Sequence, residues 1–278
     1  MMGRKKGKLA AVLLAALTAL SLTGCVSSTE IGERKIVKSL ALSQVSDGGL
    51  QAQLEIIQPE ENTFLTVVGS DVHELVENLR YKEVFFDGID QIFVQEQLLR
   101  QRGREVLRRF CIEEMDLRPG AKLYAYTGDF DQALTQITQQ QSSRLGFCDL
   151  IDCAGEVCVL PVLNSSPLGL STPQALRVQG EDVTLLEEDT YLGYLLLNRR
   201  LHDYKSRWGL VVSSLPTTDL TAGTPAVTVW TDTAQEIEAK PLEGAVAEYL
   251  QQCRRRGWPP LEGRDEQAIS FEVKVQKE

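Results

Sequence analysis

The first 24 residues differ in composition from the rest of the chain. We therefore expect only the residues after them to form the folded body. Four basic side chains lie within the first eight residues, and an uncharged, mostly apolar run of about 14 residues follows at Leu9–Leu22. A basic head, an apolar run and small residues such as Thr23-Gly24 before a cleavage point are typical of a secretory signal. A membrane-spanning helix is the alternative, but it needs roughly 20 apolar residues, and this run is shorter.

Cys25 follows the small residues directly, in Leu22-Thr23-Gly24-Cys25, and a polar stretch comes after it. Bacterial lipoproteins use this arrangement. We therefore expect cleavage before Cys25, a diacylglycerol on its thiol, and an acyl chain such as palmitate on the new amino end. Each buried methylene contributes about 0.8 kcal/mol of membrane affinity, so two or three chains anchor a protein firmly. The sequence predicts a lipid-anchored protein on the outer face of the cytoplasmic membrane.

The charge of the chain argues against two classes of partner. The whole chain has 29 basic and 39 acidic residues, and removal of the four basic residues of the leader leaves 25 against 39, a net charge near −14. Proteins that bind nucleic acid need a basic face, so we expect no nucleic-acid partner. Polybasic contact with lipid headgroups is disfavoured for the same reason, which leaves the lipid as the anchor.

The periodicity of the mature chain predicts an α+β fold of two to three small mixed domains, with antiparallel-rich sheets and packed helices. The expected divisions are a signal peptide at 1–24, an N-terminal α+β domain at 25–141, a middle α+β domain at 145–216 and a C-terminal strand–helix–strand domain at 219–278. Gln139–Ser143 is the candidate linker between the first two domains.

Individual elements follow from alternation and helical spacing. Strands are expected at 35–42, 50–56, 92–94, 123–126, 157–162, 175–178, 209–212, 226–230 and 269–275, and helices at 72–79, 96–110, 130–138 and 242–256. The first two strands flank the turn signal Ser46-Asp47-Gly48-Gly49 and read as an antiparallel hairpin. Ser70 or Asp71 is placed to cap the helix that starts at Val72.

Three of the cysteines that remain after Cys25 are spaced five apart, at Cys148, Cys153 and Cys158. A disulfide is permitted outside the cytoplasm, so these three are candidates for a local disulfide. Zinc sites usually have paired ligands two to four residues apart, often with His, and this spacing does not match, so no metal site is expected. Buried or free thiols are the alternative.

Motifs that would indicate catalysis are missing from the sequence. It contains neither of the phosphate-binding glycine motifs, no G-x-S-x-G and no H-E-x-x-H. His73 and His202 are isolated and are read as surface residues. The many carboxylates keep a surface hydrolase among the alternatives, but no acidic pair stands out. We therefore expect no enzyme activity, no catalytic residues and no cofactor.

Arg254-Arg255-Arg256 closes the last expected helix and precedes Gly257. Cations are favoured at the carboxyl end of a helix, and glycine is favoured just beyond it, so this pattern is interpreted as a helix end. A phosphate site is the second interpretation of the triplet.

The order of the elements resembles the Ger(x)C family, the lipoprotein C subunits of bacterial spore germinant receptors. In that family the lipid-bearing cysteine is followed within a few residues by Glu-Ile and then by a strand pair; here Glu30-Ile31 follows Cys25. The segment Ile92–Leu99 is similar to the strand that enters a helix in the family, and Thr184–Asp189 to its middle domain. The C-terminal domain is contracted, with the usual middle strands missing between Thr231 and Glu243.

The chain departs from the family pattern at two places, Val26, where Trp is usual, and Leu42-Ser43-Gln44, where Gly-Ile-Asp is usual. The resemblance implies a non-catalytic lipoprotein of the spore inner membrane that works with a transporter-like integral-membrane subunit and a second membrane subunit in nutrient-triggered germination. It carries over no ligand-contact residues. The alternative function is a free-standing solute-binding or scaffolding lipoprotein of the cell envelope.

Overall fold

The computed structural model describes residues 35–58, 61–139, 148–163, 174–198, 200, 204–205, 211–212, 217–219, 226–231, 239–261 and 272–277. The leader with Cys25, most of the candidate linker and His202 lie outside the described residues.

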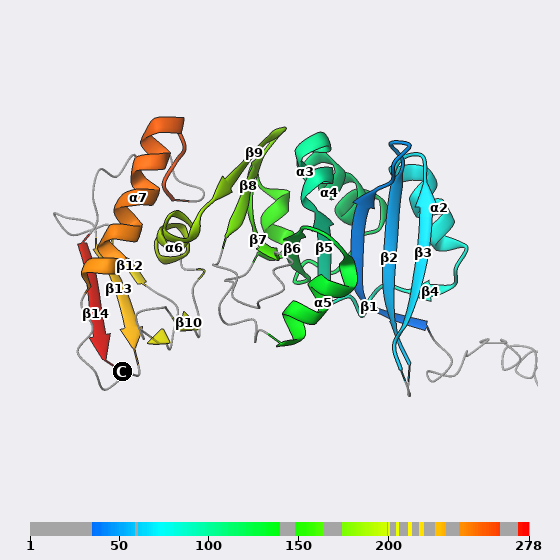
Figure 1. Ribbon diagram of the computed structural model, residues 1–278, viewed down its shortest axis with the longest axis horizontal. Helices are drawn as coiled ribbons and strands as arrows, with labels where there is room; N and C mark the ends of the chain where they lie inside the picture. The colour runs from blue at the N-terminus through cyan, green and yellow to red at the C-terminus, as the bar shows by residue number, and fades with distance from the viewer. Residues whose placement is uncertain are drawn as a thin grey trace, which may run out of the picture. The chain divides into compact units, whose positions relative to one another are not determined.

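Among the described residues, nine strands form one mixed sheet in the order β3-β2-β1-β5-β6-β7-β8-β9, with β4 paired to β1 beside this path (Figure 1). The strands are β1 (Lys35–Gln44), β2 (Leu50–Ile57), β3 (Thr63–Gly69), β4 (Val84–Phe85), β5 (Gln91–Gln95), β6 (Lys122–Tyr126), β7 (Val157–Leu163), β8 (Ala175–Gln179) and β9 (Asp182–Leu186). Both ends of the sheet are antiparallel, whereas β1, β5, β6 and β7 pair in parallel. The expected α+β fold is confirmed, and its sheet has a parallel centre that the pattern did not predict.

The first two strands form the predicted hairpin, because β1 and β2 pair antiparallel along most of their length. Gly48 in the connecting turn has φ of +89°, a conformation that glycine adopts without strain. Asp47 Oδ1 accepts a hydrogen bond from the backbone N–H of Gly49 at 3.0 Å. The alternating apolar side chains of β2 are buried, namely Leu50, Ala52, Leu54 and Ile56.

A third strand, β3, extends the hairpin, although no strand was predicted there. Its sequence is rich in β-branched and aromatic residues, which is a strand signal, but it ends only two residues before the helix at Val72. β3 pairs with β2 alone among the described strands. Phe64 and Val68 on β3 are about half exposed, at 47% and 52%.

Helices cover one face of the sheet and enclose the largest core. The first, α2 (Val72–Arg80), begins at Asp71, whose side chain accepts a hydrogen bond from the N–H of Glu74. The helix expected at 96–110 is not continuous: the chain forms α3 (Glu96–Arg102), α4 (Glu105–Leu107) and the π-helix η2 (Arg108–Glu114). The break lies at Gly103, with φ of +60°, where a Cβ would be 2.3 Å from Gly180 O in the β8–β9 turn.

A second cluster lies on the opposite face of the sheet, because successive residues of a strand point to opposite sides. Phe93 on β5 stacks on Tyr124 with ring centroids 5.6 Å apart and meets the ring of Phe130 edge-on at 5.3 Å. Phe130 opens helix α5 (Phe130–Gln139), which also contributes Ala133 and Ile137 to this cluster. The fold therefore carries apolar layers on both faces of its parallel centre.

The sheet continues across the boundary expected at 141–145. β7, at the start of the expected middle domain, pairs in parallel with β6 through Ala125–Val162 and Tyr126–Leu163. Residues 35–278 cluster as one compact unit by their contacts. The division into domains stays a prediction, and the first two expected domains share one sheet.

A smaller sheet completes the described part of the chain. Its five described strands are β10 (Tyr204–Lys205), β11 (Val211–Val212), β12 (Thr217–Asp219), β13 (Ala226–Thr231) and β14 (Glu272–Lys277). β13 precedes helix α7 (Lys240–Arg256) in the sequence and β14 follows it. The two strands pair in parallel, as the strand–helix–strand pattern requires (Figure 1). Helix α6 (Glu188–Leu197) packs on α7, and their apolar faces form a separate core with side chains of β13 and β14.

Helix α7 ends as the sequence predicts. Gly257 has φ of +69°, and its N–H donates to the carbonyl oxygen of Cys253. The three arginines of the triplet occupy the last turn of the helix. The helix-end interpretation of this pattern is confirmed.

The contact between α6 and α7 depends on Gly193, because a Cβ there would lie 2.2 Å from Ala245 O. We expect Gly193→Ala to lower the free energy of unfolding by about 1–3 kcal/mol, since the helices would have to separate. Gly244→Ala, on α7 with no atom within 4 Å of its would-be Cβ, is the matched control and should stabilise the protein by about 0.5–1 kcal/mol. Urea unfolding measures both, and equal effects would contradict the close approach.

Candidate functional site

The structure brings together the three cysteines that the sequence singles out. Cys148 precedes the short 3-10 helix η4 (Leu150–Ala154), Cys153 lies within that helix, and Cys158 lies on β7. Their side chains are 3%, 0% and 1% exposed. The thiol of Cys153 interacts electrostatically with those of both Cys148 and Cys158, so we take Cys153 as the central member of the cluster.

The surroundings of Cys153 and Cys148 raise the pKa of each thiol and so favour the neutral form. Hydrogen bonds to Cys148 and Cys158, together with burial, raise the pKa of Cys153 well above its ordinary value. At Cys148 the hydrogen bond from Cys153 lowers the pKa, but burial and nearby negative groups outweigh it, and the net shift is upward. Because the thiolate is the nucleophile and the metal ligand, Cys148 and Cys153 are poorly prepared for either role.

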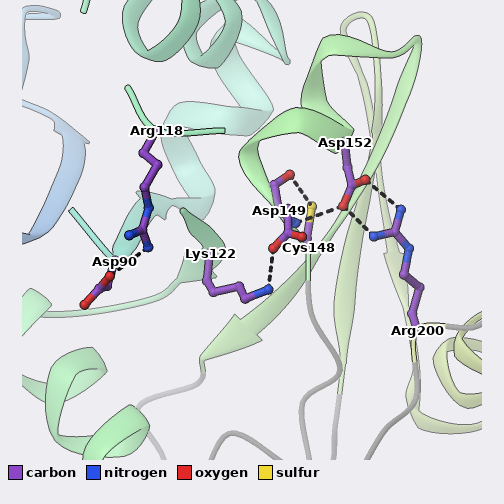
Figure 2. Close-up of polar contacts among 7 residues, drawn as sticks. All are labelled: Asp90, Arg118, Lys122, Cys148, Asp149, Asp152 and Arg200. Carbon is purple, nitrogen blue, oxygen red and sulfur yellow. Dashed lines mark hydrogen bonds and ion pairs between the residues drawn. The ribbon is translucent and has the colours of Figure 1, made fainter. Parts of the chain in front are cut away.

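Charged side chains at η4 form a frame of ion pairs, drawn in Figure 2 together with Cys148 of the cluster. Asp149 and Asp152 form a capping box at the start of η4, and Asp152 accepts a hydrogen bond from the N–H of Asp149 at 2.9 Å. Arg200 donates two hydrogen bonds to the carboxylate of Asp152, of 2.5 and 2.8 Å. Lys122 on β6 pairs with Asp149 at 2.5 Å. The frame therefore joins η4 to β6 and to the chain beyond α6.

The strength of these pairs differs with their exposure. The side chains of Arg200 and Asp152 are 16% and 19% exposed, whereas those of Arg118 and Asp90, in the outer pair of Figure 2, are 51% and 57% exposed. Water screens the exposed pair and leaves the half-buried, two-pronged pair much stronger. Asp152 is thus the structural centre of the frame.

The other residues considered from the sequence lie apart from this cluster. His73 on α2 is exposed, with Nδ1 3.9 Å from Glu114. Cys111 and Cys253 are buried and free, as are the three clustered cysteines. Within the described residues, no group of three or more His, Cys, Asp or Glu side chains is arranged to hold a metal ion. None of the described helices is both long and apolar enough to cross a bilayer.

Sequence reasoning missed the charged frame. Asp149 and Asp152, three residues apart at the start of a helical turn, were a readable capping signal. The partners Lys122 and Arg200 lie 27 and 48 residues away from them in sequence, and only the fold brings them near.

Comparison of the chain with protein-family models, curated proteins and solved structures found no match.

Double-mutant cycles measure the frame directly. For Asp152→Ala and Arg200→Ala we expect a coupling free energy of about 1–2 kcal/mol, because the pair is half-buried and two-pronged. The cycle of Asp90→Ala and Arg118→Ala is the exposed control and should give less than about 0.5 kcal/mol. A coupling in the first cycle no larger than in the second would contradict this account.

The local disulfide stays a prediction, and Cys153, whose thiol interacts with those of both Cys148 and Cys158, is the cysteine that we expect to take part in it. Oxidised glutathione, itself reduced in the exchange, should convert two thiols into one disulfide during refolding. We expect thiol titration of the denatured product to show the loss of two thiols in the wild type, in Cys148→Ser and in Cys158→Ser, and no loss in Cys153→Ser. Cys111→Ser is the control, with the wild-type loss. A disulfide that persists in Cys153→Ser would refute the central role of Cys153.

Proposed function

We propose that the chain is a membrane-anchored lipoprotein subunit of a spore germinant receptor complex, with no catalytic role. The observation that carries the proposal is the Leu22–Cys25 lipobox followed by Glu30-Ile31 and the order of elements that resembles the Ger(x)C lipoproteins. Its expected partners are a transporter-like integral-membrane subunit and a second membrane subunit at the spore inner membrane.

The arrangement of the described body is compatible with such a role. The predicted hairpin is formed by β1 and β2, and β5 runs directly into α3 at the position that resembles the family's strand-to-helix segment. The ten residues from Cys25 to the first residue of β1 span at most about 35 Å. A lipid at Cys25 would therefore hold the body within reach of membrane partners.

A free-standing solute-binding lipoprotein is less well supported. Such a protein would place its ligand in a cleft between two doubly wound α/β lobes. Here the larger sheet has antiparallel ends, and its smaller partner sheet contains a single parallel pair among the described strands.

Cys25→Ala tests the anchor in a spore-forming host. We expect the protein to leave the membrane fraction and nutrient-triggered germination to fall to the level of the gene deletion, because the body would no longer be held beside its partners. Ser28→Ala, which changes the tether and keeps the cysteine, should behave as the wild type. Full germination with an unlipidated, soluble protein would refute the role of the anchor.

The receptor assignment has its own test, because a lipoprotein of any function would lose its membrane attachment in Cys25→Ala. Affinity purification of the intact protein from detergent-solubilised spore membranes should recover a multi-pass membrane subunit. Unchanged nutrient germination after deletion of the gene would count against the assignment even if the anchor were correct.

A further inference from the structure

Apolar side chains gather at the end of the large sheet where the chain enters β1. Ile36 on β1 lies opposite Ile57 on β2 in the antiparallel register, and opposite Phe85 on β4 in the parallel register (Figure 1). Residues that pair directly across neighbouring strands have their side chains on the same face of the sheet. Ile57, Ile36 and Phe85 therefore form an apolar row across three strands.

Phe64 on β3 extends this row by one strand. It lies opposite Glu55 on β2, and Ile57 is two residues beyond Glu55 on the same face, so Phe64 and Ile57 are diagonal neighbours. The ring of Phe64 meets the ring of Phe130 edge-on, with centroids 6.1 Å apart. This contact holds Phe64 in place from one side. We call Ile36, Ile57, Phe64 and Phe85 the apolar end of the sheet.

The carboxylate beside the apolar end is turned into the protein. Glu55 is only 7% exposed. Its carboxylate accepts hydrogen bonds from the hydroxyl of Ser39 at 2.6 Å and from the side-chain amide of Asn62 at 2.7 Å. A polar group that is hydrogen-bonded within the protein loses less on desolvation than an unpaired one. Glu55 therefore does not prevent the apolar end from lying against an apolar phase.

Three side chains of the apolar end are exposed. Ile57, Phe64 and Phe85 are 46%, 47% and 38% exposed. Single exposed apolar residues are normal on a protein surface, whereas contiguous ones indicate a contact with another protein or with a membrane. Three exposed neighbours on adjoining strands belong to the second case.

The tether indicates which contact this is. Lys35, the first residue of β1, directly precedes Ile36, and the ten residues from Cys25 to Lys35 span at most about 35 Å. The expected lipid is thus joined to the body at the apolar end itself. A short tether gives an effective concentration on the order of millimolar, so even a weak contact with the bilayer becomes populated.

We propose that the apolar end rests on the lipid bilayer, with Ile57, Phe64 and Phe85 at the boundary between headgroups and acyl chains. Such binding grows with the apolar area that is buried. Lys35 and the exposed Glu61 of the β2–β3 turn are costly to move into hydrocarbon, so the contact is shallow. The proposal rests on the lipid anchor of the proposed function and goes beyond it, because it specifies which end of the body faces the membrane.

Quenching of tryptophan fluorescence by brominated phosphatidylcholine tests the contact. The lipidated protein, with its lipid confirmed by the intact mass, is reconstituted in vesicles of this lipid. Phe64→Trp and Phe85→Trp should each be quenched more than the wild type, whose three native tryptophans set the baseline. Bromines near the headgroup should quench more than bromines near the chain ends. Ile151→Trp, at a position 58% exposed on η4, is the matched control and should add no quenching.

The outcomes separate the contact from the anchor. A mature protein that carries no lipid would refute the anchor, and this proposal with it. If the lipid is present and Phe64→Trp is quenched no more than Ile151→Trp, the contact is refuted and the anchor stands. Blue-shifted emission without bromine quenching would show that protein covers the apolar end, either the tether or a second copy, and would also overturn the proposal.

Removal of neighbouring side chains locates the contact. In the Phe64→Trp protein, the added changes Ile57→Ser and Phe85→Ser should lower bromine quenching at least about twofold, because apolar contact area is lost. Adding Ile151→Ser and Tyr81→Ser instead removes side chains that are 58% and 79% exposed elsewhere, and should leave quenching unchanged. Thermal melting checks the fold, and Ile57→Ser alone replaces the pair if the pair unfolds. Equal quenching in both sets would contradict the proposal.

Discussion

The double pairing of β1 is the constraint on which the larger sheet depends. β1 joins the antiparallel hairpin partner β2 to the parallel strand β5, and it also pairs with the short β4. Val37 is three residues before Leu40, so strict alternation would place them on opposite faces of the strand. A register shift between Val37 and Ser39 lets Val37 share one core with Leu40 and Leu42. On the opposite side, the buried hydroxyl of Ser39 donates to Glu55 at 2.6 Å. A strand satisfied on both edges and both faces fixes the register of its neighbours.

The sequence predicted elements well where the local signal and the fold agree. Alternation in β2, the Asp71 cap of α2 and the Gly257 end of α7 depend on neighbours in sequence, and each is found as expected. Prediction failed where a distant contact decides the outcome. The helix expected at 96–110 breaks because the backbone at Gly103 meets Gly180, 77 residues further along the chain. The pairing of β6 with β7, which extends one sheet past the candidate linker, has no local signal.

The same limit applies to the candidate sites. The five-residue spacing of the cysteines was visible, and the fold adds that the thiol of Cys153 interacts electrostatically with the other two. The charges around them could not be paired from sequence, because Arg200 meets Asp152 only through the packed chain. The contact between Arg177 and the Trp258 ring could not be predicted either, because the two residues are far apart in sequence and only the fold brings them together.

The central place of β1 has a mechanical side. In the proposed anchored state, any pull from the bilayer through the Cys25 tether enters the folded body at Lys35, the first residue of β1. An edge strand under such a load can be peeled off one hydrogen bond at a time. β1 is held by ladders on both of its edges, so the load must act on both ladders together. A pull through the tether would therefore be shared by the whole nine-stranded sheet, which helps the body to stay folded when it is held close to the membrane.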